Sequence, residues 1–179
     1  MKKILVLMVA ALFLSAAPAW ALTVNAGATD VGGYDKLKFT ATQGSPELPS
    51  AGDADELAWV RDVLNDQTIT LAAKYTQMNW LLTNEPGVYA IDLQTNPEYF
   101  LVKIGGGAGS TGYTHFLYEN LESLNWGVVA LAELGLSTTN ITALSHVDEF
   151  NGTQVPEPIS MLLLGFGLVG LAGVKRFRK

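Results

Sequence analysis

Glu98-Tyr99-Phe100-Leu101-Val102-Lys103-Ile104 is the stretch that decides the fold of this chain. It is rich in aromatic and β-branched side chains, and turn signals bound it on both sides, Asn96-Pro97 before it and Gly105 after it. Short runs of this composition between Pro, Asn and Gly residues are typical of β-strands. We therefore expect a strand at 98–104 in a mainly β domain.

Six further segments show strand signals on either side of this run. Polar and apolar residues alternate at 36–41 and at 68–72, where the second pattern can be followed to Tyr75. The other candidate strands are 88–93, 113–118, 125–131 and 146–150. Short strands with frequent turns favour a sandwich or a barrel. We expect an antiparallel β-sandwich that resembles a jelly roll.

One helix is expected, at 53–64. It begins with Asp53, Asp55 and Glu56, and acidic side chains complement the dipole at a helix N-terminus. Its predicted apolar face consists of Leu57, Val60, Val63 and Leu64, with Trp59 and Arg61 beside it. The three acids could alternatively start a calcium site, although the later glycine and glutamate of an EF-hand loop are missing.

The first 21 residues have the pattern of a secretory signal peptide. Lys2-Lys3 is a basic start, the run 4–14 is apolar, and Ala19-Trp20-Ala21 has small residues at both positions of a cleavage site. We expect signal peptidase to cut between Ala21 and Leu22. The exported body would then be a single domain at 22–154.

The segment after this body has three parts. Val155-Pro156-Glu157-Pro158 is a short motif, and residues 159–174 are uncharged and apolar. Sixteen residues make about 24 Å of helix, slightly less than the roughly 30 Å hydrocarbon core, and snorkelling side chains can absorb this deficit. We expect a transmembrane helix whose basic end stays cytoplasmic, with the body outside. That basic end consists of Lys175, Arg176, Arg178 and Lys179.

Residues 155–179 resemble the PEP-CTERM sorting signal of Gram-negative bacteria. In that family the Pro-Glu-Pro tripeptide is read by exosortase, a membrane-embedded transpeptidase. The resemblance implies that Pro156-Glu157-Pro158 is a processing signal and that such an enzyme is a partner. It also implies a body that is first anchored in the inner membrane and then reaches the cell surface or an extracellular matrix.

The same resemblance suggests a second partner. Exosortase is associated with exopolysaccharide production, so an extracellular polysaccharide is expected to bind the body. The segments 98–105 and 125–129 are also similar to a strand pair in many exported bodies of this family, which favours a sandwich. Aromatic side chains could stack on sugar rings, although most will belong to the core. The candidates are Trp59, Trp80, Trp126 and the six tyrosines, with Trp80, Tyr89, Tyr99 and Tyr113 first among them.

Composition excludes several kinds of partner and chemistry. Residues 22–158 hold 17 acidic and five basic side chains, a net charge of −12, so the body should repel nucleic acid. The chain has no cysteine, which excludes thiolate metal sites and a cysteine nucleophile. His115 and His146 are too few for a three-histidine metal site. We expect no metal and no cofactor.

The motifs favour a protein that is not an enzyme. Gly109-Ser110-Thr111-Gly112 approaches a nucleophile elbow, but Ala108 replaces its leading glycine, and the run 105–112 is better interpreted as a hairpin loop. The segment 165–170 matches G-x-G-x-x-G, but no acidic residue follows it as a dinucleotide site requires. We expect ordinary roles for His115 and His146. The alternatives are a secreted hydrolase, using Ser110 or an acid pair, and a calcium-dependent adhesion module.

Overall fold

The computed structural model describes residues 21–105, 111–121 and 125–151. The signal-peptide segment 1–20, Ser110 and the sorting tail 155–179 lie outside these residues. None of the helices in the described ranges is long and apolar enough to cross a membrane. The span expected at 159–174 lies outside the described residues.

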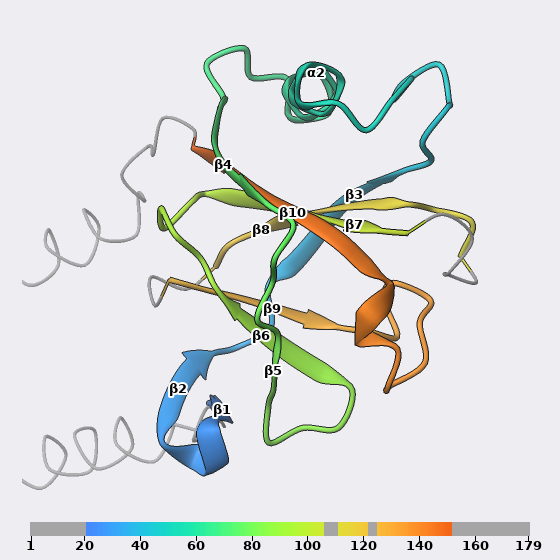
Figure 1. Ribbon diagram of the computed structural model, residues 1–179. Coiled ribbons are helices and arrows are strands. Elements are labelled where there is room, and N and C mark those ends of the chain that lie inside the picture. Colours follow the sequence, from blue (N-terminus) through green and yellow to red (C-terminus); the bar gives the residue numbers. More distant parts are fainter. Residues whose placement is uncertain (1–20, 106–110, 122–124, 152–179) are drawn as a thin grey trace, which may run out of the picture.

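The described residues form a mainly β structure with one α-helix (Figure 1). Every strand pair in it is antiparallel, which confirms the expected fold class at this level. In chain order the elements are β1 (Leu22–Val24), η1 (Asn25–Gly27), β2 (Thr29–Gly32), β3 (Lys36–Ala41), α2 (Asp53–Leu64), β4 (Thr70–Tyr75), β5 (Leu81–Leu82), β6 (Val88–Asp92), β7 (Tyr99–Ile104), β8 (His115–Glu119), β9 (Trp126–Ala130), η2 (Ile141–Ala143) and β10 (Leu144–Asn151).

The strands are divided between two sheets and a small ribbon. The larger sheet has five strands in the order β3-β8-β7-β10-β4, and the smaller has three in the order β5-β6-β9. Strands β1 and β2 form the ribbon. The order does not reproduce a jelly roll, because a jelly roll is built from two Greek keys of four strands each. Strand β7 lies between β8, the next strand in the chain, and β10.

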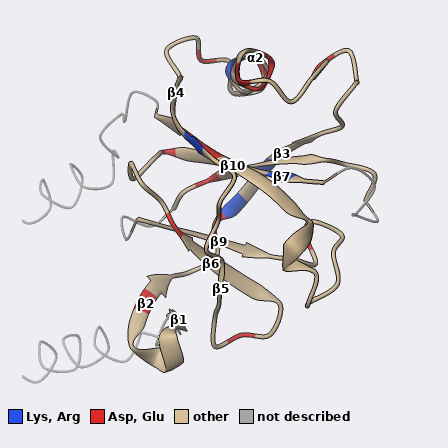
Figure 2. Cartoon of the chain, in the orientation of Figure 1, with Lys and Arg blue, Asp and Glu red and all other residues tan. Residues whose placement is uncertain are grey.

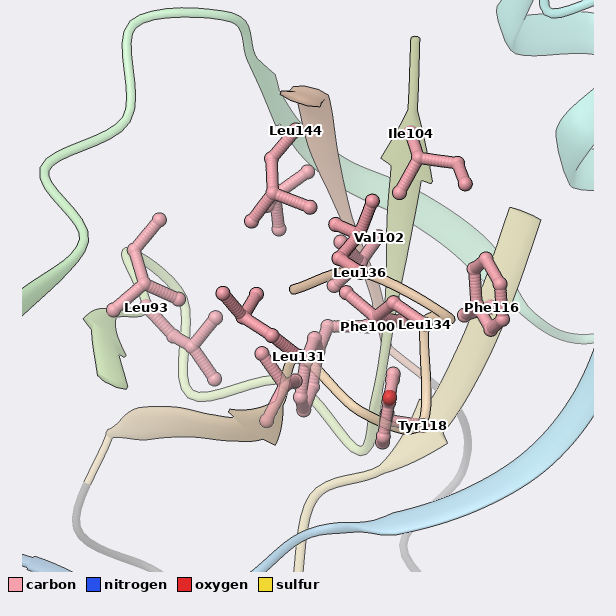
Figure 3. Close-up of a cluster of buried hydrophobic side chains, with 13 residues drawn as sticks. Leu93, Phe100, Val102, Ile104, Phe116, Tyr118, Leu131, Leu134, Leu136 and Leu144 are labelled. Carbon is pink, nitrogen blue, oxygen red and sulfur yellow. The ribbon is translucent and has the colours of Figure 1, made fainter. Parts of the chain in front are cut away.

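The main core lies between the two sheets (Figure 3). Phe100 and Val102 of β7 point into it, and the Phe100 ring stacks on Tyr118 of β8 with centroids 5.2 Å apart. Leu101, between them, points to the other face of the five-stranded sheet. Strand β7 is thus buried on both faces, which explains why the run 98–104 is almost continuously apolar.

Helix α2 covers that other face of the five-stranded sheet, and the β1–β2 ribbon covers the outer face of the three-stranded sheet (Figure 1). The buried residues of α2 are Glu56, Trp59 and Val60. Leu57, Val63 and Leu64 are only partly buried, so the helix is rotated relative to the apolar face expected from the sequence. The reason is that Glu56, although charged, finds polar partners on the sheet.

Candidate functional site

Five polar side chains meet between α2 and the five-stranded sheet, and we call them the α2 cluster. They are Glu56 of α2, Lys74 of β4, His115 of β8, and His146 and Asp148 of β10. His146 and Asp148 are two positions apart, so both point to the α2 face. Glu56, His115 and Asp148 are completely buried, and His146 is 5% exposed. Charged groups are rarely buried to this degree unless they are paired.

Both histidines bind the same oxygen atom. Nε2 of His115 lies 3.0 Å from Oε1 of Glu56, and Nε2 of His146 lies 2.9 Å from it. An ionised carboxylate only accepts hydrogen bonds, so each Nε2 carries a proton and donates it. Nδ1 of His115 then accepts from the Thr114 hydroxyl, 2.8 Å away.

Lys74 occupies the opposite side of the two carboxyl groups. Its Nζ atom donates to Oε2 of Glu56 at 2.5 Å and to Oδ2 of Asp148 at 3.4 Å. It also pairs with the exposed Asp53 at 3.0 Å. The Oε2 and Oδ2 atoms therefore face the lysine, while Oε1 of Glu56 faces the histidines. Lys103 of β7 is paired in register with both histidines and supplies a second nearby positive charge.

Burial and pairing set the charges in the α2 cluster. Burial opposes ionisation of Glu56, but hydrogen bonds from His115, His146 and its other partners outweigh it and place its pKa far below the usual range. Burial, reinforced by the neighbouring Glu56, raises the pKa of Asp148 to about 8. Burial lowers the pKa of His115, which keeps this ring neutral. At neutral pH, Asp148 therefore holds a proton that it can share with Glu56.

One oxygen atom of the α2 cluster, Oδ1 of Asp148, is buried and has no hydrogen-bond partner among the described residues. It lies 3.9 Å from Nε2 of His146, which is beyond hydrogen-bond distance. Buried polar atoms are nearly always paired, so this oxygen requires an explanation.

A second buried carboxylate, that of Glu149, lies on the next residue of β10, and both of its oxygens have hydrogen-bond donors. Glu149 points to the opposite side of the sheet from Asp148 and accepts four hydrogen bonds. Its donors are the Tyr75 hydroxyl at 2.8 Å, the Gln94 amide at 2.6 Å, and the amide and hydroxyl of Thr95 at 2.8 and 2.5 Å. We call Glu149, Tyr75, Gln94 and Thr95 the Glu149 cluster. It fixes the Tyr75 ring and the loop at 93–95.

Next to the Glu149 cluster the surface is hollowed by a groove of about 290 Å³. Two aromatic rings, three amide side chains and one carboxylate contribute to its wall. The residues are Tyr75, Gln77, Asn79, Leu81, Ile91, Asp92, Gln94 and Trp126. None of them is basic. All basic residues of the described chain lie in α2 or in the five-stranded sheet, as Figure 2 shows.

The structure separates the candidates that the sequence suggested. Trp59 of α2 and Tyr118 of β8 are buried, Trp80, Tyr89 and Tyr99 pack against the cores, and Tyr34 and Tyr113 are exposed. Of these candidates, Tyr75 and Trp126 line the groove.

The three acids of the possible calcium site pair with other side chains, and Asp53 and Glu56 share Lys74. Asp55 accepts a hydrogen bond from Ser50, and Glu56 turns inward to the histidines. These contacts agree with the interpretation of the acids as a helix start.

Sequence reasoning did not find the α2 cluster. The two histidines come from β8 and β10, which flank β7, and their rings approach to 6.4 Å across that strand. The one signal in the sequence was the two-residue spacing of His146 and Asp148, which places both on one face of a strand. Glu56 was interpreted as part of a helix start or, alternatively, of a calcium site.

The comparisons with known proteins bear on the tail. Residues 154–179 match the family described as PEP-CTERM protein-sorting motif, one residue longer than the resemblance seen in the sequence. No curated protein and no solved structure matches the chain.

Proposed function

We propose that the body of this chain binds a neutral exopolysaccharide and is not an enzyme. The chain carries a PEP-CTERM protein-sorting motif, which indicates an exported protein sorted by exosortase. The bound polymer would hold the body at the cell surface or in the extracellular matrix after processing at Pro156-Glu157-Pro158.

The groove carries this proposal. Tyr75 and Trp126 come from different sheets and offer two aromatic surfaces in one hollow. Apolar ring faces can stack on the C–H surfaces of a sugar, and amide groups both donate to and accept from its hydroxyls. Gln77, Asn79 and Gln94 supply these amides. A groove without a basic side chain favours an uncharged polymer over an acidic one.

The groove is also preorganised. Glu149 holds the Tyr75 hydroxyl and the backbone of Gln94, so both residues are fixed before a ligand arrives. A site that needs no rearrangement loses less entropy on binding. This matters for a polysaccharide, since each repeating unit contributes few contacts.

The placement of the acids and bases supports a role without catalysis. His115 and His146 both donate to Glu56 in the α2 cluster, away from solvent, where neither can take a proton from a substrate. Glycoside hydrolysis requires two carboxyl groups across the scissile bond. Asp92 is the one carboxylate that lines the groove, and the nearby Glu149 is occupied by four donors.

Affinity electrophoresis of the full chain through the host's own exopolysaccharide tests this proposal. We expect retardation, which Trp126→Ala should abolish. Gln77→Ala, at an exposed position where folding is not at risk, should weaken it. Tyr113→Ala removes an exposed aromatic ring outside the groove and should leave it unchanged.

Retardation that survives both groove substitutions would refute the groove as the binding site. Release of reducing sugar from the polymer by the wild-type chain would show an enzyme instead.

A further inference from the structure

We propose that the α2 cluster is a closed metal site for a divalent transition metal of the zinc type, with Nε2 of His115, Nε2 of His146, Glu56 and Asp148 as its four ligands. This inference is independent of the proposed function, because the α2 cluster and the groove lie on opposite faces of the five-stranded sheet. Its expected role is structural: the metal would tie α2 to the sheet.

The donor set points to this class of metal. Glu56, His115 and His146 each offer one ligand atom, and these atoms lie within 4.8 Å of one another. Zinc is bound by imidazole nitrogen and carboxylate oxygen, usually with four ligands where the site is structural. Magnesium and calcium prefer oxygen alone, so two imidazoles argue against both.

The distances require only small movements. In a tetrahedral site with bonds of about 2.0–2.1 Å, neighbouring ligand atoms are roughly 3.3–3.4 Å apart. The two Nε2 atoms lie 3.0 and 2.9 Å from Oε1 of Glu56. Glu56, His115 and His146 thus already lie within reach of one ion, whereas Asp148, whose Oδ1 is 3.9 Å from Nε2 of His146, would have to turn toward it as the fourth ligand.

Asp148 provides the independent observation. Its side chain is completely buried, and its Oδ1 atom has no hydrogen-bond partner among the described residues although it lies 3.9 Å from Nε2 of His146. A metal ion between these atoms would satisfy the oxygen. Lys74 contacts only the other oxygen of each carboxyl group, so Oδ1 and Oε1 both remain directed toward the histidines.

The surroundings of His115 suit a metal ligand as well. Metal-bound histidines usually hydrogen-bond through their second ring nitrogen, which fixes the ring. Nδ1 of His115 has Thr114 Oγ1 at 2.8 Å, and that hydroxyl has the Ala41 carbonyl at 3.5 Å as a second acceptor. When Nε2 binds metal, the ring proton moves to Nδ1 and is donated to Thr114, whose hydroxyl then donates to Ala41.

The test uses the full chain and zinc ions. After loading and dialysis, elemental analysis should find one zinc per chain, and the midpoint of thermal unfolding should be higher with zinc than with a chelator, since a ligand of the folded state stabilises it. Asp148→Asn keeps the shape of the side chain but is a poor ligand, and it should abolish both effects while the chain still folds. Glu47→Gln, at an exposed acid outside the cluster, should change neither.

A finer variant separates a metal site from a hydrogen-bonded cluster. Thr114→Val removes the partner of His115 without touching a ligand, and it should weaken zinc binding by about 10–100-fold in competition with a chromophoric chelator. The proposal is overturned if the wild-type chain retains no zinc and unfolds at the same temperature with zinc and with chelator. It is equally overturned if Asp148→Asn binds zinc as tightly as the wild type.

Discussion

Asp148 and Glu149 are neighbours on one strand, both completely buried, yet their surroundings differ in one decisive respect. Glu149 receives four hydrogen bonds from neutral donors and needs nothing more. Asp148 receives one long contact from Lys74 and can share a proton with Glu56, but its Oδ1 atom is left unpaired among the described residues. The comparison teaches that burial alone does not reveal a binding site. What distinguishes one here is the unsatisfied atom among potential ligands.

The two clusters also hold different parts of the molecule together. The Glu149 cluster joins β10 to β4 and to the loop at 93–95, which form one side of the groove. The α2 cluster joins the helix to β4, β8 and β10. The following substitutions compare them, starting with the largest expected effect, and all are measured on the full chain with chelator present so that metal does not contribute.

Removing the Glu149 carboxylate should lower the free energy of unfolding the most. Glu149→Ala removes the acceptor of four part-buried hydrogen bonds, and we expect the free energy of unfolding to fall by about 3–4 kcal/mol. Urea unfolding measures this loss. Glu47→Ala, at an exposed acid, should stay within about 0.5 kcal/mol of the wild type. A loss no larger than that of the control would show that the Glu149 cluster is not structural.

Removing the carboxylate of the α2 cluster should cost somewhat less. Glu56→Ala deprives two buried Nε2–H groups of their acceptor, but Lys74 keeps Asp53 and Asp148. We expect a loss of about 2–3 kcal/mol in the same urea experiment. If Glu56→Ala proved more damaging than Glu149→Ala, the ranking of the two clusters would be wrong.

Removing a single hydrogen-bond donor should lower the free energy of unfolding less than removing either carboxylate. Tyr75→Phe removes one of four hydrogen bonds to Glu149, and we expect a loss of about 0.5–1.5 kcal/mol. Because the same hydroxyl positions the ring in the groove, retardation by the exopolysaccharide should weaken as well. If Tyr75→Phe kept both the stability and the binding of the wild type, the hydrogen bond from Tyr75 to Glu149 would contribute neither to the fold nor to the groove.

The smallest effect is expected at Asp148. Its pKa of about 8 means that the side chain is mostly uncharged at pH 7, and asparagine replaces it without a change of shape. Asp148→Asn should therefore alter the free energy of unfolding by less than about 1 kcal/mol without metal. A large loss under chelator would mean that the Asp148 carboxylate already has a structural partner, which contradicts the comparison.

Much of the fold follows from local patterns in the chain. The strand at 98–104 and the helix at 53–64 were predicted almost to the residue, because both faces of β7 are apolar and α2 begins with a run of acids. Strands β1, β2 and β5 were missed, since they have three, four and two residues and too little pattern to detect.

The α2 cluster depended on information that local patterns do not contain. His115 and His146 meet through the strand order β8-β7-β10, and Glu56 joins them because α2 is rotated toward the sheet. Likewise, Tyr75 and Trp126 share a groove only through the packing of two sheets. The sorting motif was recognised because its parts are contiguous in the sequence.

The most direct test of the contrast between the two clusters is anomalous diffraction at the zinc absorption edge, from crystals of the full chain grown with zinc. We predict one peak in the α2 cluster, about 2.0–2.1 Å from Nε2 of His115 and of His146 and bordered by Oδ1 of Asp148, and none beside Glu149. Both histidines still bound to Glu56, with no peak between them, would contradict the account.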